Sequence, residues 1–221
     1  MGAYGRFFGN DSAFGKIMTK WGTIIMINIL FVICCIPFFT IGAAAAAMYY
    51  AIFEMLNTET PINPIVMYWR GLRKNFFPAT VSWLAFVGII GLGTVNLQIC
   101  RQAGGWIQYL SAGVIAVLMA AVIVMVYLLP AHALFSGKMA ERIKLAVCAA
   151  MSHPLRMLLV LLLHAVPLAV VYIDEVNRPT YAFISVFFGF GLLARVIGKI
   201  LLPQFEPYLN IMETNRHIKN I

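Results

Sequence analysis

The side chains that could do chemistry in this sequence are few, and most of them lie inside long apolar runs. A polar group at bilayer depth is costly, so it is the first place to look for function. We single out these intramembrane candidates: Asn28, Asn96, Gln98, His164 and Arg195. His164 stands out because Pro167 cannot donate a backbone hydrogen bond and therefore frees the carbonyl of Leu163 beside the imidazole. Either this turn serves a substrate or a proton, or His164 bonds to an Asn or Ser of a neighbouring helix.

No catalytic or metal-ligating pattern accompanies these residues. Among only eight carboxylates, Asp174 and Glu175 are adjacent and cannot flank one substrate bond. The patterns G-x-S-x-G, H-E-x-x-H, G-x-x-x-x-G-K-[ST] and C-x-x-C are all missing. His132 and His153 lack a carboxylate partner, which leaves them short of a metal site. We expect a non-enzymatic protein with no cofactor and no metal.

The composition explains why the polar residues are so few. The chain has 221 residues, of which 62% are apolar and only 11% are charged. The mean hydropathy is +0.88. Soluble domains are about 25% charged, so this chain cannot cover a water-facing surface. We therefore expect the chain to be embedded in a lipid bilayer, which is the first of its predicted partners. The formal charge of +8 would suggest nucleic acid in a soluble chain, but in a membrane chain it reflects topology, and we expect no nucleic acid.

Uncharged runs of about 20 residues, the length that crosses a hydrocarbon core, predict about six spans. The fold class is all-α, a polytopic transmembrane helical bundle. The expected spans cover residues 21–39, 41–56, 78–100, 106–135, 155–173 and 179–202. They form one transmembrane domain, 21–204, between a cytoplasmic arm, 1–20, and a cytoplasmic tail, 205–221. Small residues in the second span predict that Ala43–Ala47 packs closely against another helix.

Charge placement supports this topology. If residues 21–39 and 41–56 both cross, every cation except Arg101 and Arg178 lies on the cytoplasmic side, together with both termini. If residues 41–56 do not cross, Arg70 and the cations after it change sides, which breaks the positive-inside rule.

Residues 61–77 form a basic amphipathic segment in the predicted cytoplasmic interface. It serves either as an interfacial anchor that orients the next span or as a docking element for a cytoplasmic partner. The docking candidates are Tyr68, Trp69, Arg70, Arg73 and Lys74.

The first hairpin carries a motif that resembles the signature N…C-x-P-x-x-T-x-G-x-x-x-x-A-x-Y-Y of the YesL-like bacterial membrane proteins, known as domain of unknown function 624. The matching motif residues are Asn28, Cys35, Pro37, Thr40, Gly42, Tyr49 and Tyr50. Residues 75–80 are similar to the N-F-x-x-A-T entry to the family's next span, with Pro78 where a polar residue is usual. The resemblance implies a multi-pass plasma-membrane protein of Gram-positive bacteria, often encoded beside oligosaccharide ABC importers and sensor kinases. It supplies no established catalytic or binding residues.

From these features we expect an accessory or assembly partner of a carbohydrate ABC transport system in the plasma membrane. Its partners would be importer permease or ATPase subunits. The chain lacks the E-A-A-x-x-x-G loop of true permeases. The alternative is a small-solute transporter or channel that acts as a homo-oligomer, with Asn28, Asn96 and His164 lining its path.

Overall fold

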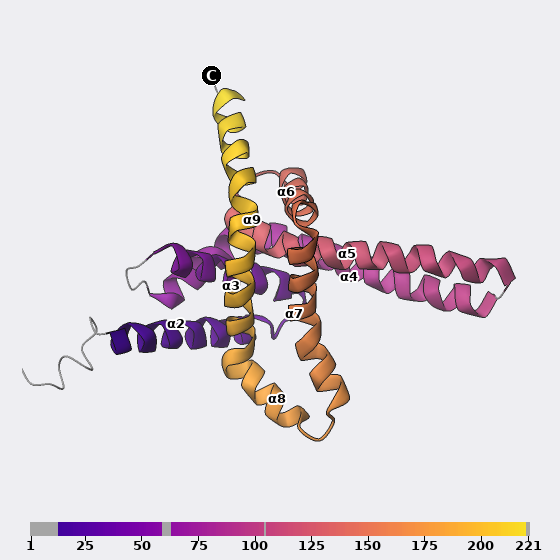
Figure 1. Cartoon of the computed structure of the whole chain (residues 1–221), viewed down its shortest axis with the longest axis horizontal. Helices are drawn as coiled ribbons and strands as arrows, with labels where there is room; N and C mark the ends of the chain where they lie inside the picture. Colours follow the sequence, from indigo (N-terminus) through magenta and orange to yellow (C-terminus); the bar gives the residue numbers. More distant parts are fainter. Residues whose placement is uncertain (1–12, 59–62, 104, 220–221) are drawn as a thin grey trace, which may run out of the picture.

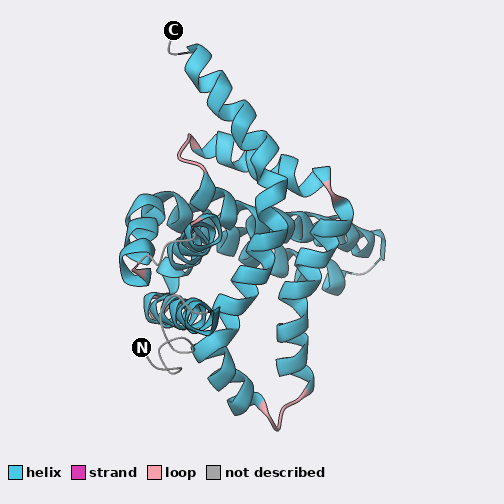
Figure 2. Ribbon diagram, turned by 60° about the vertical axis from the view of Figure 1, so that its left-hand side comes forward, coloured by secondary structure: helices cyan, strands magenta, loops and turns pink. Residues whose placement is uncertain are grey.

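The computed structural model describes residues 13–58, 63–103 and 105–219, although the side chains of 13–14, 16–17, 105–106 and 210–219 are outside the description. Most of the expected amino-terminal arm, residues 1–12, also lies outside it. The chain forms the following elements: α2 (Ala13–Cys34), the short 3-10 helix η1 (Phe38–Thr40), α3 (Ile41–Asn57), α4 (Pro64–Ala103), η2 (Gly105–Tyr109), α5 (Leu110–Leu134), α6 (Met139–Ser152), α7 (Pro154–Ile173), α8 (Arg178–Ile184), the π-helical η3 (Ser185–Gly189) and α9 (Phe190–Lys219). The described residues contain no strand, so the all-α fold class is confirmed (Figure 2).

Within the described residues, five helical segments are long and apolar enough to cross a membrane. They are Phe38–Asn57, Pro64–Ala103, Ile107–Leu134, Pro154–Ile173 and Arg178–Leu209. A shorter apolar helix, Met18–Cys34, precedes them. The expectation of about six spans therefore corresponds to five long helices and one short one. The short one is the first segment, Met18–Cys34. Residues 41–56, the shortest of the expected spans, belong instead to one of the five long segments.

Helix α3 forms the centre of the molecule. It packs against α2, α4, α5 and α9. Ala43–Ala47 is buried, as predicted. Small side chains allow helix backbones to approach closely in lipid, where no hydrophobic drive holds helices together.

Helix α4 runs without interruption for 40 residues, although an interfacial segment and a separate span were expected here. Pro78 lies inside it and removes one backbone donor. The first half of α4 lies along α3, with Gly71 against Tyr50 and Ala79 against Gly42. The second half pairs with α5, where Gly93 meets Leu118. One helix thus positions two successive hairpins.

The helices do not form a simple parallel bundle. In Figure 1 the α4–α5 hairpin projects to the right of the molecule, while α7 and α9 run steeply across it. The core lies around α3, where these two arms meet. Helix α9 continues through the expected boundary at residue 204 as far as Lys219.

The predicted loop between the fourth and fifth spans folds into α6. Its first turn is stabilised by Glu141, whose Oε2 accepts a hydrogen bond of 3.2 Å from the Lys138 amide. Arg142, Leu145 and Ala149 lie on its buried face. This face packs against α5, α7 and α9, so the connection is part of the core.

Candidate functional site

Four buried polar side chains meet where α4, α5 and α6 come together: Asn75 and Ser82 on α4, His132 on α5 and Arg142 on α6. We call them the polar cluster. His132 is at its centre, with Nε2 2.9 Å from Ser82 Oγ and Nδ1 2.9 Å from Arg142 Nη1. Arg142 Nη1 also lies 3.3 Å from Asn75 Oδ1. Arg142 Nε donates to the Gly137 carbonyl at 3.0 Å.

The direction of each hydrogen bond in the polar cluster follows from the donor chemistry. A guanidinium can only donate, so His132 Nδ1 must accept from Arg142. His132 is therefore neutral and carries its proton on Nε2, which donates to Ser82 Oγ. The Ser82 hydroxyl in turn donates to the Pro78 carbonyl, 2.9 Å away. The chain of donors runs from Arg142 toward Ser82.

This direction is opposite to that of a nucleophilic serine pair. A general base must accept the serine proton, and it is normally oriented by a third group that accepts from its other nitrogen. Here the third group is a cation that donates. The polar cluster therefore has a structural role: its hydrogen bonds hold α4, α5 and α6 together. Burial lowers the pKa of Arg142, but a guanidinium remains charged in proteins.

A pocket of about 190 Å³ opens next to the polar cluster, between the end of α3, the first half of α4 and the end of α5. Phe53 and Leu134 supply its apolar part. Its polar lining comes from Tyr50, Glu54, Asn57 and Lys74. The Lys74 ammonium lies over the Tyr50 ring, 5.2 Å from the centroid, in a cation–π arrangement.

Only part of the predicted docking segment is on the surface. Trp69 is 46% exposed. Arg70, Arg73 and Lys74 are exposed as well. Tyr68, however, is fully buried, and its hydroxyl donates to the Ala44 carbonyl at 3.2 Å. It holds α4 to α3, so it does not contribute to an exposed surface.

Asn28 is also fully buried, and it connects α2 to the irregular segment of the last span. Its Oδ1 accepts from the Gly191 amide at 2.6 Å, and its Nδ2 donates to the Ser185 and Val186 carbonyls. A π-helical turn leaves backbone groups misaligned, and one amide side chain here supplies a partner to three of them. Asn28 therefore has a structural role: its side chain provides the hydrogen bonds that the irregular backbone around η3 lacks.

The other motif residues build the α2–α3 apex. Thr40 Oγ1 lies 2.6 Å from the Cys34 carbonyl and 2.7 Å from the Pro37 carbonyl. A Cβ on Gly42 would lie 2.5 Å from the Ala79 carbonyl oxygen, so only glycine allows α4 this close. Cys35 follows α2 directly, and its amide donates to the Phe31 carbonyl at 2.9 Å.

The motif ends with two tyrosines that face different surroundings. Tyr49 is buried and stacks on Phe53. Tyr50 packs its ring between Gly71 and Lys74 at the pocket. The two tyrosines thus place the end of the motif at the pocket, through Tyr50 itself and through the contact of Tyr49 with Phe53.

The remaining intramembrane candidates are not brought together. Asn96 is exposed and bonds to the Leu92 carbonyl of its own helix at 2.8 Å, and Gln98 is exposed on the same helix. His164 Nδ1 lies 2.9 Å from the Val160 carbonyl, again within its own helix, and among the described residues it forms no bond to a neighbouring helix, which was one of its two predicted roles.

Arg195 is half-buried on α9. Among the described side chains, the one ion pair within 4.0 Å joins Arg178 to Glu175, and Arg195 does not take part in it. The described residues also contain no group of three or more His, Cys, Asp or Glu side chains placed to hold a metal ion.

Sequence reasoning missed most of the polar cluster. Arg142 was counted among the cytoplasmic cations, Asn75 was noted as part of the segment similar to the family's, and Ser82 was not noted. One signal was available for Arg142, because it precedes Leu145, Ala146 and Ala149 at helical spacing and so shares their buried face.

Five long apolar helices around a buried core define a multi-pass helical membrane protein. The model of the family described as "Protein of unknown function, DUF624" matches residues 24–97, which confirms the family resemblance of the sequence motif. The matched region covers the α2–α3 hairpin from residue 24 and most of α4. Comparison with curated proteins found no match, and comparison with solved structures found none either.

Proposed function

We propose that this protein is a non-enzymatic accessory or assembly partner of a carbohydrate ABC transport system in the plasma membrane. The observation that carries the proposal is the exposed face of α4 formed by Trp69, Arg70 and Arg73. The opposite face of the same turns, with Tyr68 and Leu72, is buried in the core. A partner would therefore meet a surface that is already ordered, which reduces the entropy cost of binding.

The chemistry of this face favours a protein partner with an acidic surface. Arginine and tryptophan are enriched among the residues that dominate binding energy at interfaces. Cations at the rim also speed the encounter with a negatively charged surface. The family resemblance supports an importer as the setting, because such proteins are often encoded beside oligosaccharide ABC importers.

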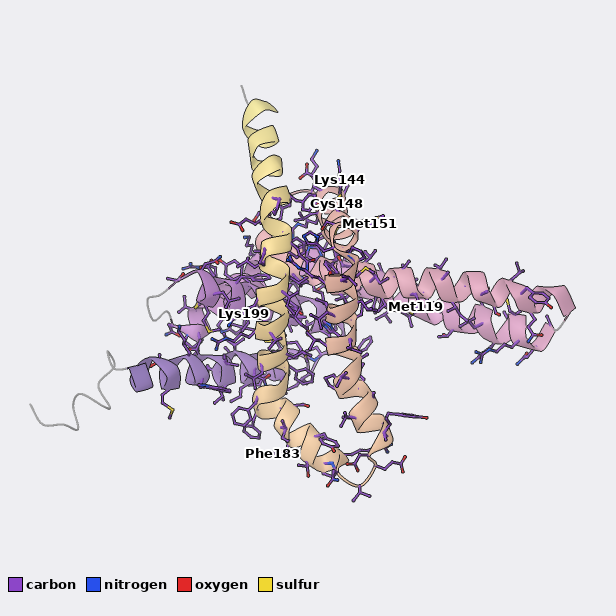
Figure 3. All side chains as sticks on the ribbon, in the orientation of Figure 1. Met119, Lys144, Cys148, Met151, Phe183 and Lys199 are labelled. Atoms are coloured by element: carbon purple, nitrogen blue, oxygen red, sulfur yellow. The ribbon has the colours of Figure 1, made fainter. Side chains whose placement is uncertain are left out.

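The test is recovery of importer subunits with the protein from mild detergent, quantified by mass spectrometry. We expect permease or ATPase subunits to be recovered with the unaltered chain and to be lost with Trp69→Ala and with Arg73→Glu. Lys144→Glu is the matched control, because Lys144 is exposed on a different element, α6 (Figure 3). Equal recovery with all variants, or no importer subunit with the unaltered chain, would refute the proposal.

A further inference from the structure

The pocket beside the polar cluster contains two opposite charges that do not pair with each other. Glu54 and Lys74 both line it. Within the described part of the chain, their charged groups are not joined by an ion pair of 4.0 Å or less. The Lys74 ammonium instead lies over the Tyr50 ring. Two charged groups therefore face one small volume from separate positions in its wall.

The surroundings of the pocket are net positive. Arg142 is close enough to act electrostatically on Lys74. Glu54 and Arg70 both act electrostatically on the Tyr50 hydroxyl. Glu54 is the one carboxylate of the lining. Lys74, Arg70 and Arg142 against one carboxylate favour an anionic group near Lys74, while the carboxylate oxygens of Glu54 can accept a hydrogen bond from a donor on the same ligand.

The volume limits the size of that ligand. The pocket has a volume of about 190 Å³, which accepts a small polar group. Phe53 and Leu134 add an apolar wall that suits a short carbon backbone between two polar ends.

We infer that this pocket binds an organic phosphate that carries a hydroxyl or ammonium group at its other end. The phosphate lies at Lys74, and the donor group bonds to Glu54 and Asn57. Glycerol phosphate and phosphoethanolamine have this chemistry as free molecules. The headgroups of phosphatidylglycerol and phosphatidylethanolamine present the same chemistry from the membrane.

Two binding measurements on the purified full chain distinguish these sources. Calorimetry with glycerol 3-phosphate reports the free molecule. Native mass spectrometry after incorporation into nanodiscs reports lipids that stay bound, with phosphatidylglycerol and phosphatidylcholine compared. Phosphatidylcholine is the matched control ligand, since its quaternary ammonium has no N–H to donate to Glu54.

Lys74→Gln should weaken whichever ligand binds by about tenfold or more, because it removes a charged hydrogen bond. Glu54→Ala should reduce the preference for phosphatidylglycerol over phosphatidylcholine. Lys144→Gln, on the exposed side of α6, should change neither the affinity for the ligand nor the preference between the two lipids. Thermal unfolding of each variant verifies that the fold is kept, as expected for exposed Lys74.

The outcomes are decisive in both directions. Binding of glycerol 3-phosphate that is lost in Lys74→Gln supports a free ligand, and retention of phosphatidylglycerol alone supports a lipid headgroup. The inference is overturned if neither probe binds, if Lys74→Gln behaves like Lys144→Gln, or if phosphatidylcholine is held as tightly as phosphatidylglycerol.

Discussion

The proton on His132 gives the sharpest test of the polar cluster. Because Arg142 can only donate, the structure requires a neutral imidazole with its proton on Nε2 and a bare Nδ1. Nitrogen-15 NMR of the histidine-labelled protein distinguishes a protonated ring nitrogen from an unprotonated one. The His132→Gln variant assigns the signal. A proton on Nδ1, or a charged imidazole at neutral pH, would refute the derived bond directions.

The same reasoning ranks two substitutions of His132. His132→Asn keeps an acceptor near the position of Nδ1, and His132→Gln keeps a donor near the position of Nε2. The bond to the charged Arg142 is worth about 1.5–3 kcal/mol, and the neutral bond to Ser82 about 0.5–1.5 kcal/mol. We therefore expect His132→Asn to be the more stable of the two by about 1 kcal/mol, measured by denaturant unfolding in mixed micelles. The opposite order would mean that Ser82, not Arg142, dominates the cluster.

Three further predictions concern other contacts. Gly42→Ala should lower the unfolding free energy by about 1–3 kcal/mol, because its Cβ would overlap α4, whereas Gly22→Ala, with open space around it, should be nearly neutral. Tyr127→Phe should lower the unfolding free energy by about 1–3 kcal/mol, because Gln204 would lose the 3.3 Å bond to its Oε1 and its Nε2 has no partner among the described residues. Adding Gln204→Leu should recover much of this loss. The pKa of Asp174 is lowered by its hydrogen bonds, so the contribution of this turn to stability is present above the ordinary carboxylate pKa and is lost as pH falls through the lowered one; an NMR titration of Asp174 that shows no lowering would contradict this.

The sequence predicted the features that depend on local pattern. Apolar runs located the helices because a bilayer demands about 20 uncharged residues whatever the neighbours are. The Ala43–Ala47 stripe was correctly placed in the core because small side chains at helical spacing have few other uses in lipid. Each of these inferences depends on the sequence of a single helix and not on how the helices pack together.

The polar cluster could not be predicted in this way, because it depends on which helices meet. Asn75 and Arg142 are 67 residues apart and become neighbours only because α4 and α6 both pack against α5. Arg142 lies between Lys138 and Lys144 in a predicted loop, and such a cation is usually solvated. Its burial could therefore not be predicted from its neighbours in the sequence. The interfacial segment was separated from the next span because Pro78 reads as a helix boundary, yet α4 tolerates it.

The length of α4 sets the depth of everything packed against it. Forty residues rise about 60 Å, which is twice the thickness of a hydrocarbon core of about 30 Å. An upright α4 therefore immerses only about half of itself, and its uncharged run from Pro78 to Cys100, most of which pairs with α5, is the part suited to acyl chains. Gly71 precedes Pro78 by seven residues, so it and the neighbouring Tyr50 then lie about 10 Å outside the hydrocarbon core, at the outer edge of the headgroups on the side where the cations gather. A pocket for a phosphate at that level would open where the headgroups meet water.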